Sequence, residues 1–161
     1  MKILVLTDPE VLPPGDAGLS GKDASVHECT EFHVAESLRA AGHEVRVEAF
    51  REPVGALLET LSSARPDLVY NLTEHVNGRR EHDVHIAAMI ELLGLPCTGA
   101  GPKGLMVSRD KALCKRILGH HRIGVPRFDV VPPGRTVPRR RLGYPVLVKP
   151  LLEDGSDGIS L

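Results

Sequence analysis

The chain has 161 residues, of which 42% are hydrophobic and 25% are charged, and its formal net charge is −1. This composition is typical of a globular protein with a buried core, and it excludes a disordered chain and a strongly basic nucleic-acid-binding one. The three cysteines are too few and too scattered for a disulfide framework, which favours reduced thiols and a cytoplasmic location. The apolar run before Asp8 is too short for a signal peptide or a membrane span, so we expect no membrane partner.

The first hundred residues or so alternate between runs typical of strands and helical periodicities. Residues 3–6 form a continuous apolar run, as in a parallel strand that is buried on both faces. In chain order we expect a strand at 3–6, a loop at 9–24, a helix at 28–41 ended by Gly42, a strand at 44–50, a helix with Val54, Leu57, Leu58 and Leu61 on one face, a strand at 68–72, a helix with Ile86, Met89, Ile90 and Leu93 on one face ended by Gly94, and a short strand at 95–98. This order predicts a doubly wound, mostly parallel α/β sheet of Rossmann type, with ligands at the carboxyl ends of its strands.

The pattern changes at a glycine-rich hinge, residues 98–102, which we interpret as the boundary between domains at 1–102 and 103–161. After it we expect a helix at 108–120 with Ser108 as its N-cap, strands at 128–131 and 144–150, and a glycine-rich turn at 153–158. These elements would leave a sheet with unpaired edges, so we expect the second domain to be truncated.

Three segments carry a resemblance to a known family. They contain ELLGLPCTGAG at 91–101, DK at 110–111 in a stretch that runs to Pro126, and VKP at 148–150 followed by EDGSDGIS at 153–160. In this order and spacing they resemble the D-alanine–D-alanine ligase branch of the ATP-grasp superfamily. The resemblance implies a Rossmann-like pre-ATP-grasp domain followed by the beginning of an ATP-grasp α+β domain, the N-terminal part of a longer enzyme.

The resemblance also implies a site for the phosphates of ATP. The residues that match the family's phosphate-binding positions are Lys111, Lys149, Glu153, Gly155, Ser156 and Gly158. Lysines neutralise phosphate charge, and glycines let backbone N–H groups approach it. Gly155 stands where the family often has a serine that helps to close this loop, so the usual closing mechanism is in doubt.

For the amino-acid substrate, the resemblance points to Glu28 near the start of the first helix and to Glu74 and Glu81 in the loop before the ELLG helix. His82 and His85 are three residues apart, which is not the spacing of a helical zinc site, and we expect no metal ligand within the chain. The ligands of Mg²⁺ are expected beyond residue 161.

The function implied is that of an ATP-dependent carboxylate–amine ligase that forms a C–N bond through an acylphosphate, with ATP and Mg²⁺ as cofactors, in peptidoglycan biosynthesis. Its partners would be small amino acids and a second copy in a homodimer, and the fragment alone would be inactive. Two alternatives remain open: an ATP-grasp ligase for other amino acids or peptides, which the departures at Glu28 and Gly155 favour, and a non-catalytic doubly wound binding module.

Overall fold

The computed structural model describes residues 1–9, 30–50, 53–135 and 142–153. The chain divides into two compact units, residues 1–102 and 103–161. Each unit is described by itself.

The first unit is built on a parallel sheet of strands β1 (Lys2–Thr7), β2 (Glu44–Ala49) and β3 (Leu68–Asn71). Their order is β2-β1-β3, and Ile3 lies opposite Val45 on one side and Leu68 on the other. The central strand β1 is buried from Ile3 to Thr7, because both of its edges are paired and both of its faces are covered. The predicted parallel sheet is confirmed, and β2 lies at one edge of the described sheet.

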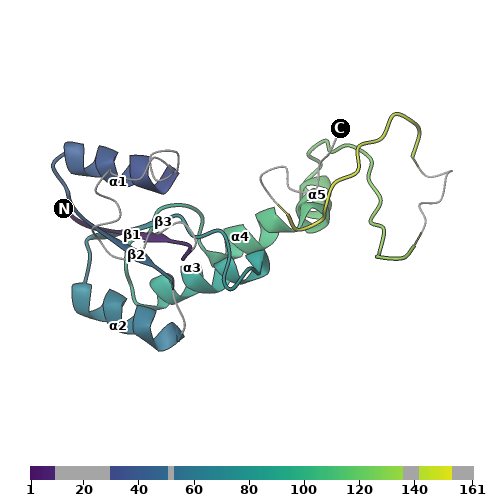
Figure 1. Ribbon diagram of the computed structural model, residues 1–161. Helices are drawn as coiled ribbons and strands as arrows, with labels where there is room; N and C mark the ends of the chain where they lie inside the picture. The colour runs from purple at the N-terminus through teal and green to yellow at the C-terminus, as the bar shows by residue number, and fades with distance from the viewer. Residues whose placement is uncertain (10–29, 51–52, 136–141, 154–161) are drawn as a thin grey trace. The chain divides into compact units, whose positions relative to one another are not determined.

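Helices cover both faces of this sheet (Figure 1). Helix α1 (Thr30–Ala40) packs on the face that carries Ile3 and Val5, and Phe32 and Ala35 complete that core. The opposite face carries Leu4 and Leu6. It is covered by α2 (Val54–Ala64) and α3 (Asp83–Leu92), which contribute Leu57, Leu61, Ile86 and Ile90 to the core. Because side chains alternate along a strand, one β1 sequence supplies both cores, as in a Rossmann-like α/β fold.

Two helices of this unit end at the glycines predicted to stop them. Gly42 and Gly94 have φ angles of 83° and 66°, in the left-handed region. At Gly94 the N–H donates to Glu91 O at 2.9 Å and the next N–H, of Leu95, donates to Ile90 O at 3.2 Å. This is the Schellman arrangement, which satisfies the last carbonyls of α3 and turns the chain back toward the sheet.

The predicted fourth strand at 95–98 is wrong, because the structure forms a single parallel bridge there, between Cys97 and Val69. The Val69 N–H donates to Pro96 O at 2.8 Å, and the Thr98 N–H donates to Val69 O at 3.0 Å. Pro96 has no N–H to donate, and Gly99 turns away with φ of 86°, so the pairing cannot extend.

The second unit contains α4 (Pro102–Arg109) and α5 (Lys111–His120). The predicted N-cap Ser108 is wrong: Ser108 lies within α4, and Asp110 caps α5 by accepting the N–H groups of Ala112 and Leu113, both at 2.9 Å. Asp is as good an N-cap as Ser, and only Asp110 stands at the break between the two helices. Ala112 is the one buried residue among those described from 103 onward.

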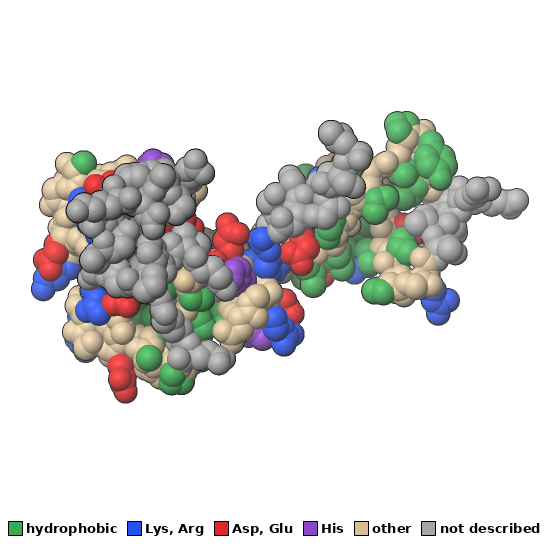
Figure 2. All heavy atoms as spheres, in the orientation of Figure 1, with side chains coloured by type: hydrophobic (Ala, Val, Ile, Leu, Met, Phe, Trp, Pro, Cys, Tyr) green, Lys and Arg blue, Asp and Glu red, His purple; other side chains and the backbone are tan. Residues whose placement is uncertain are grey.

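The strands predicted at 128–131 and 144–150 are also absent, since both segments are irregular. Leu147 and Val148 are 72% and 81% exposed, and hydrophobic side chains are visible on the surface of this unit (Figure 2). A strand needs a hydrogen-bonded neighbour, and no described residue pairs with these segments. None of the described helices is both long enough and apolar enough to cross a bilayer.

Candidate functional site

The carboxyl ends of β1 and β3 lie side by side, and the residues that follow them build a polar site. Asp8 comes directly after β1, and Thr73 comes two residues after β3. These two residues are only 5% and 9% exposed. In an open parallel sheet this edge is where ligands bind. The loop that follows β3, residues 72–79, therefore occupies the position of a binding loop.

The side chain of Asp8 receives this loop. Asp8 Oδ2 accepts the N–H of Glu74 at 2.9 Å, and Oδ1 accepts the N–H of His75 at 3.5 Å. Nε2 of His75 lies 3.6 Å from Asp8 Oδ2. Successive backbone N–H groups that converge on one anion form a nest, and here the anion is a carboxylate of the chain itself.

The start of the loop is fixed by a second set of hydrogen bonds. Asn71 Oδ1 accepts the Thr73 N–H at 3.2 Å and the Thr73 hydroxyl at 2.7 Å. The Asn71 N–H donates to Thr98 Oγ1 at 3.0 Å, which ties β3 to the segment after the Cys97 bridge. Short polar side chains of this kind replace the ladder bonds that are lost where a strand ends.

A tight hairpin closes the loop. Val76 and Arg79 exchange two backbone hydrogen bonds, at 3.0 and 3.1 Å, around Asn77 and Gly78. Both central residues have positive φ, 53° and 70°, which is the type I′ turn favoured by an Asn-Gly pair. The loop is therefore held at both its start and its tip, and Gly78 supplies one of the two positive φ angles that the turn requires.

Two ion pairs lie on the surface of this loop and of the short 3-10 helix η3 (Arg80–His82) that follows it. Arg80 Nη1 lies 3.2 Å from Glu74 Oε2, and Arg79 donates twice to Glu81 Oε1, at 3.0 and 2.9 Å. The pKa of Glu81 is lowered, first by a backbone hydrogen bond to its carboxylate and next by the Arg79 guanidinium. Both glutamate side chains are exposed, and side chains of this type can bind a ligand ammonium group.

The predicted substrate residues Glu74 and Glu81 are thus brought into one loop region, whereas Glu28 lies outside the described residues. In the second unit, the Lys111 ammonium contacts the carbonyl oxygens of Leu151, at 3.4 Å, and Glu153. Lys149 is exposed. Gly155, Ser156 and Gly158 lie outside the described residues, so the phosphate site can be followed only as far as Glu153.

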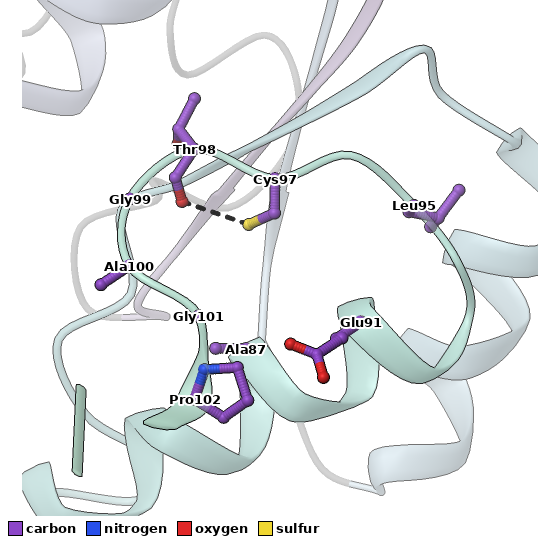
Figure 3. Close-up of a pocket in the computed structure, with 9 residues that line it drawn as sticks. All are labelled: Ala87, Glu91, Leu95, Cys97, Thr98, Gly99, Ala100, Gly101 and Pro102. Carbon is purple, nitrogen blue, oxygen red and sulfur yellow. Dashed lines mark hydrogen bonds between the residues drawn. The ribbon is translucent and has the colours of Figure 1, made fainter. Parts of the chain in front are cut away.

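A separate hollow of about 240 Å³ lies between α3 and the glycine-rich segment that follows the Cys97 bridge (Figure 3). Glu91 of α3 points toward it, and the Cys97 thiol donates to Thr98 O at 3.3 Å across its rim. Partial burial raises the pKa of Cys97, so its thiol stays protonated at neutral pH.

Sequence reasoning missed Asp8, Thr73 and the role of Asn77. An Asp directly after a buried parallel strand was a usable signal for the first, and the Asn-Gly pair was one for the last. The contact of Asp8 with residues 66 and 67 positions away has no local signature.

No protein-family model matches the chain. A D-alanine–D-alanine ligase of Anaplasma marginale is 33% identical over 78% of this chain and 36% of its own length. The corresponding ligase of Bordetella petrii is 40% identical over 53% of the chain and 27% of its own length. An uncharacterized protein of Sinorhizobium fredii, y4sG, is 32% identical over 80% of the chain and 39% of its own length. The chain spans well under half the length of these relatives. It is therefore homologous to part of the D-alanine–D-alanine ligases, the family that its sequence motifs predict.

Proposed function

We propose that the chain is part of an ATP-dependent ligase that joins the carboxylate of one amino acid to the amine of another, with D-alanine as its substrate. The observation that carries the proposal is the contact of Lys111 with the backbone at 151 and 153. It joins two of the three family motifs, DK at the start of α5 and the segment after VKP, in one unit. This is the arrangement that a shared phosphate site requires.

In this proposal residues 103–161 begin the ATP-grasp domain and bind the phosphates. Lys111 and Lys149 would neutralise phosphate charge, each contact gaining about 4 kcal/mol of Coulomb energy before desolvation at an effective dielectric near 20. Glu153, Gly155, Ser156 and Gly158 would form the covering loop, with backbone N–H groups directed at the phosphate oxygens. Lys111 would exchange its carbonyl partners for phosphate when ATP binds.

Residues 1–102 would form the pre-ATP-grasp domain and hold the amino acid. Glu74, Glu81 and Glu28 would supply carboxylates for its ammonium group at the carboxyl edge of the sheet. ATP supplies the phosphoryl group that turns the substrate carboxylate into an acylphosphate. The amine of the second amino acid then displaces phosphate from the acylphosphate. The products are the molecule with the new C–N bond, ADP and inorganic phosphate.

Magnesium would neutralise part of the negative charge of the phosphates. The family resemblance places its ligands beyond residue 161, and the described residues hold no group of three His, Cys, Asp or Glu side chains that could bind a metal ion. The biological setting would be peptidoglycan synthesis in the cytoplasm, with a homodimer as the assembled form.

A second candidate is a ligase of the same chemistry for another amino acid or a peptide. Gly155, at the position where the family often has a serine, favours it, because the loop would then close on different contacts. Titration of the chain with D-alanine, L-alanine and short peptides separates the two candidates.

The test of the proposal is titration of the isotope-labelled chain with ATP and D-alanine, followed by NMR. We expect ATP to shift resonances of Lys111 and of 149–158, and D-alanine, but not L-alanine, to shift resonances of 73–82. Lys149→Ala should weaken the ATP response at least about tenfold, the loss expected for one charge-assisted contact. Lys103→Ala removes an exposed lysine outside the motifs and serves as the control.

Absence of any ATP response, or an equal loss in both lysine variants, would reject the phosphate site. The chain alone should release no phosphate from ATP with Mg²⁺ and D-alanine, because it spans only a part of its ligase relatives.

A further inference from the structure

Asp8 is a buried acidic residue at the carboxyl ends of the strands of the sheet. Its side chain is 7% exposed, and it follows the buried strand β1. A carboxylate removed from water to this degree is costly unless hydrogen bonds replace its hydration. The replacement comes from the loop after β3, through the N–H groups of Glu74 and His75 and the nearby imidazole of His75.

The residue whose N–H binds Asp8 also carries a solvent-facing carboxylate. The side chain of Glu74 is 68% exposed, while its backbone N–H lies 2.9 Å from Asp8 Oδ2. The backbone position of Glu74 is therefore set by Asp8, and Arg80, 3.2 Å from its carboxylate, sets the direction of the side chain. Glu74 therefore has one buried contact, through its backbone, and one contact at the surface, through its carboxylate.

We propose that Asp8 is a positioning residue for the amino-acid site: its carboxylate binds the loop as an anion binds a nest, and so holds Glu74 in place to receive the substrate ammonium group. The part that concerns the substrate rests on the proposed function. Asp8 does not touch the substrate, since its oxygens are directed at the loop backbone. It acts by fixing a contact residue before the ligand arrives, which lowers the ordering cost of binding.

The chain offers a matched control at the other end of the same two strands, where β1 and β3 begin. Asp67 Oδ2 accepts the N–H of Lys2 at 2.7 Å, so it too is a carboxylate that joins the β1 and β3 regions through a backbone hydrogen bond. Replacement of Asp67 removes a bond of the same kind without touching the loop. A general loss of sheet stability would appear in both variants, whereas loss of positioning would appear only at Asp8.

The experiment compares Asp8→Asn, Asp8→Ala and Asp67→Ala in the 161-residue chain. Hydrogen exchange of the Glu74 and His75 amides reports on the loop, and exchange within β1 and β3 reports on the sheet. We expect Asp8→Ala to speed exchange of both loop amides by about tenfold or more relative to the strand amides, since each loses a hydrogen bond to a charged group. Asp8→Asn, which keeps one acceptor oxygen and the side-chain volume, should give a smaller change and remains informative if the alanine variant does not fold.

Binding of D-alanine is measured on the same samples. We expect its affinity to fall about tenfold in Asp8→Ala, partly in Asp8→Asn, and not in Asp67→Ala. Unchanged exchange at Glu74 and His75 in folded Asp8 variants would overturn the proposal, and so would faster exchange with unchanged D-alanine affinity. Failure of the unmodified chain to bind D-alanine would contradict the proposed function, while the exchange rates would still decide whether Asp8 holds the loop.

Discussion

Glu81 is held as a carboxylate by its surroundings, which has a consequence for acid stability. Its pKa is lowered below the ordinary 4.5, first by a backbone hydrogen bond and next by Arg79. A group whose pKa is lower in the folded than in the unfolded state stabilises the fold at pH values above its unfolded-state pKa. That contribution is lost as the pH falls from 4.5 through the folded pKa.

Arg79→Gln should therefore raise the pKa of Glu81 part of the way toward its ordinary value, since the backbone hydrogen bond stays. An NMR titration of the Glu81 carboxyl carbon measures this change. Arg39→Gln removes the arginine partner of another exposed glutamate, Glu36, and should leave the pKa of Glu81 unchanged. Equal shifts in both variants would show that the Arg79 contact is not the cause.

Leu61 and Leu92 give a second contrast between single residues. Leu61 is fully buried between α2 and the sheet, whereas Leu92 is 88% exposed. Leu61→Ala should lower the free energy of unfolding by about 2 to 5 kcal/mol, because it leaves a cavity in a packed core. Leu92→Ala should change it by less than about 0.5 kcal/mol. Urea unfolding followed by circular dichroism measures both, and a similar loss at the two sites would contradict the assigned core.

Among the elements, the end of α3 depends on a conformation that only glycine adopts at low cost. Gly94 has a φ angle of +66°, and an added Cβ would meet no atom within 4 Å, so the cost of a side chain there is conformational. Gly94→Ala should destabilise the chain by about 1 to 2 kcal/mol. Gly55, in the first turn of α2, is equally open and has no positive φ, so Gly55→Ala should instead stabilise it by up to about 1 kcal/mol. Thermal unfolding measures both variants. If Gly94→Ala lowers the melting temperature and Gly55→Ala raises it, the backbone conformation is the cause.

Most elements of the first unit could be predicted because their signals are local, and the exception is the strand expected at 95–98, where the structure forms a single bridge. The apolar run of β1, the alternation in β2 and the stops at Gly42 and Gly94 are each read within a few residues. The strands expected at 128–131 and 144–150 were wrong because a strand exists only with a neighbour, which local pattern does not supply. For the site, the resemblance directed attention to Glu74 and Glu81, but the Asp8 contacts that organise their loop join distant residues and could not be inferred.

At the scale of the molecule, the two units differ in the number of buried residues that form a hydrophobic core. Both hydrophobic clusters consist entirely of residues from 1 to 102. Beyond residue 102 the only buried residue described is Ala112. We therefore expect residues 1–102, produced alone, to keep a cooperative thermal transition and dispersed NMR resonances, whereas residues 103–161 alone should show no cooperative transition. A cooperative transition in the second fragment, or none in the first, would contradict this division.

The central position of β1 also determines the order in which the chain can fold. This strand is synthesised first, yet it pairs on one side with β2, which begins at Glu44, and on the other with β3, which begins at Leu68. Both pairings are distant in sequence, and contacts of this kind are slow to form because a long loop must close before they add stability. During synthesis the apolar run of β1 thus remains without its complete sheet until residue 71 has left the ribosome. Among the described residues, the strand that is most completely buried after folding is thus the one that a nascent-chain chaperone would have longest to bind.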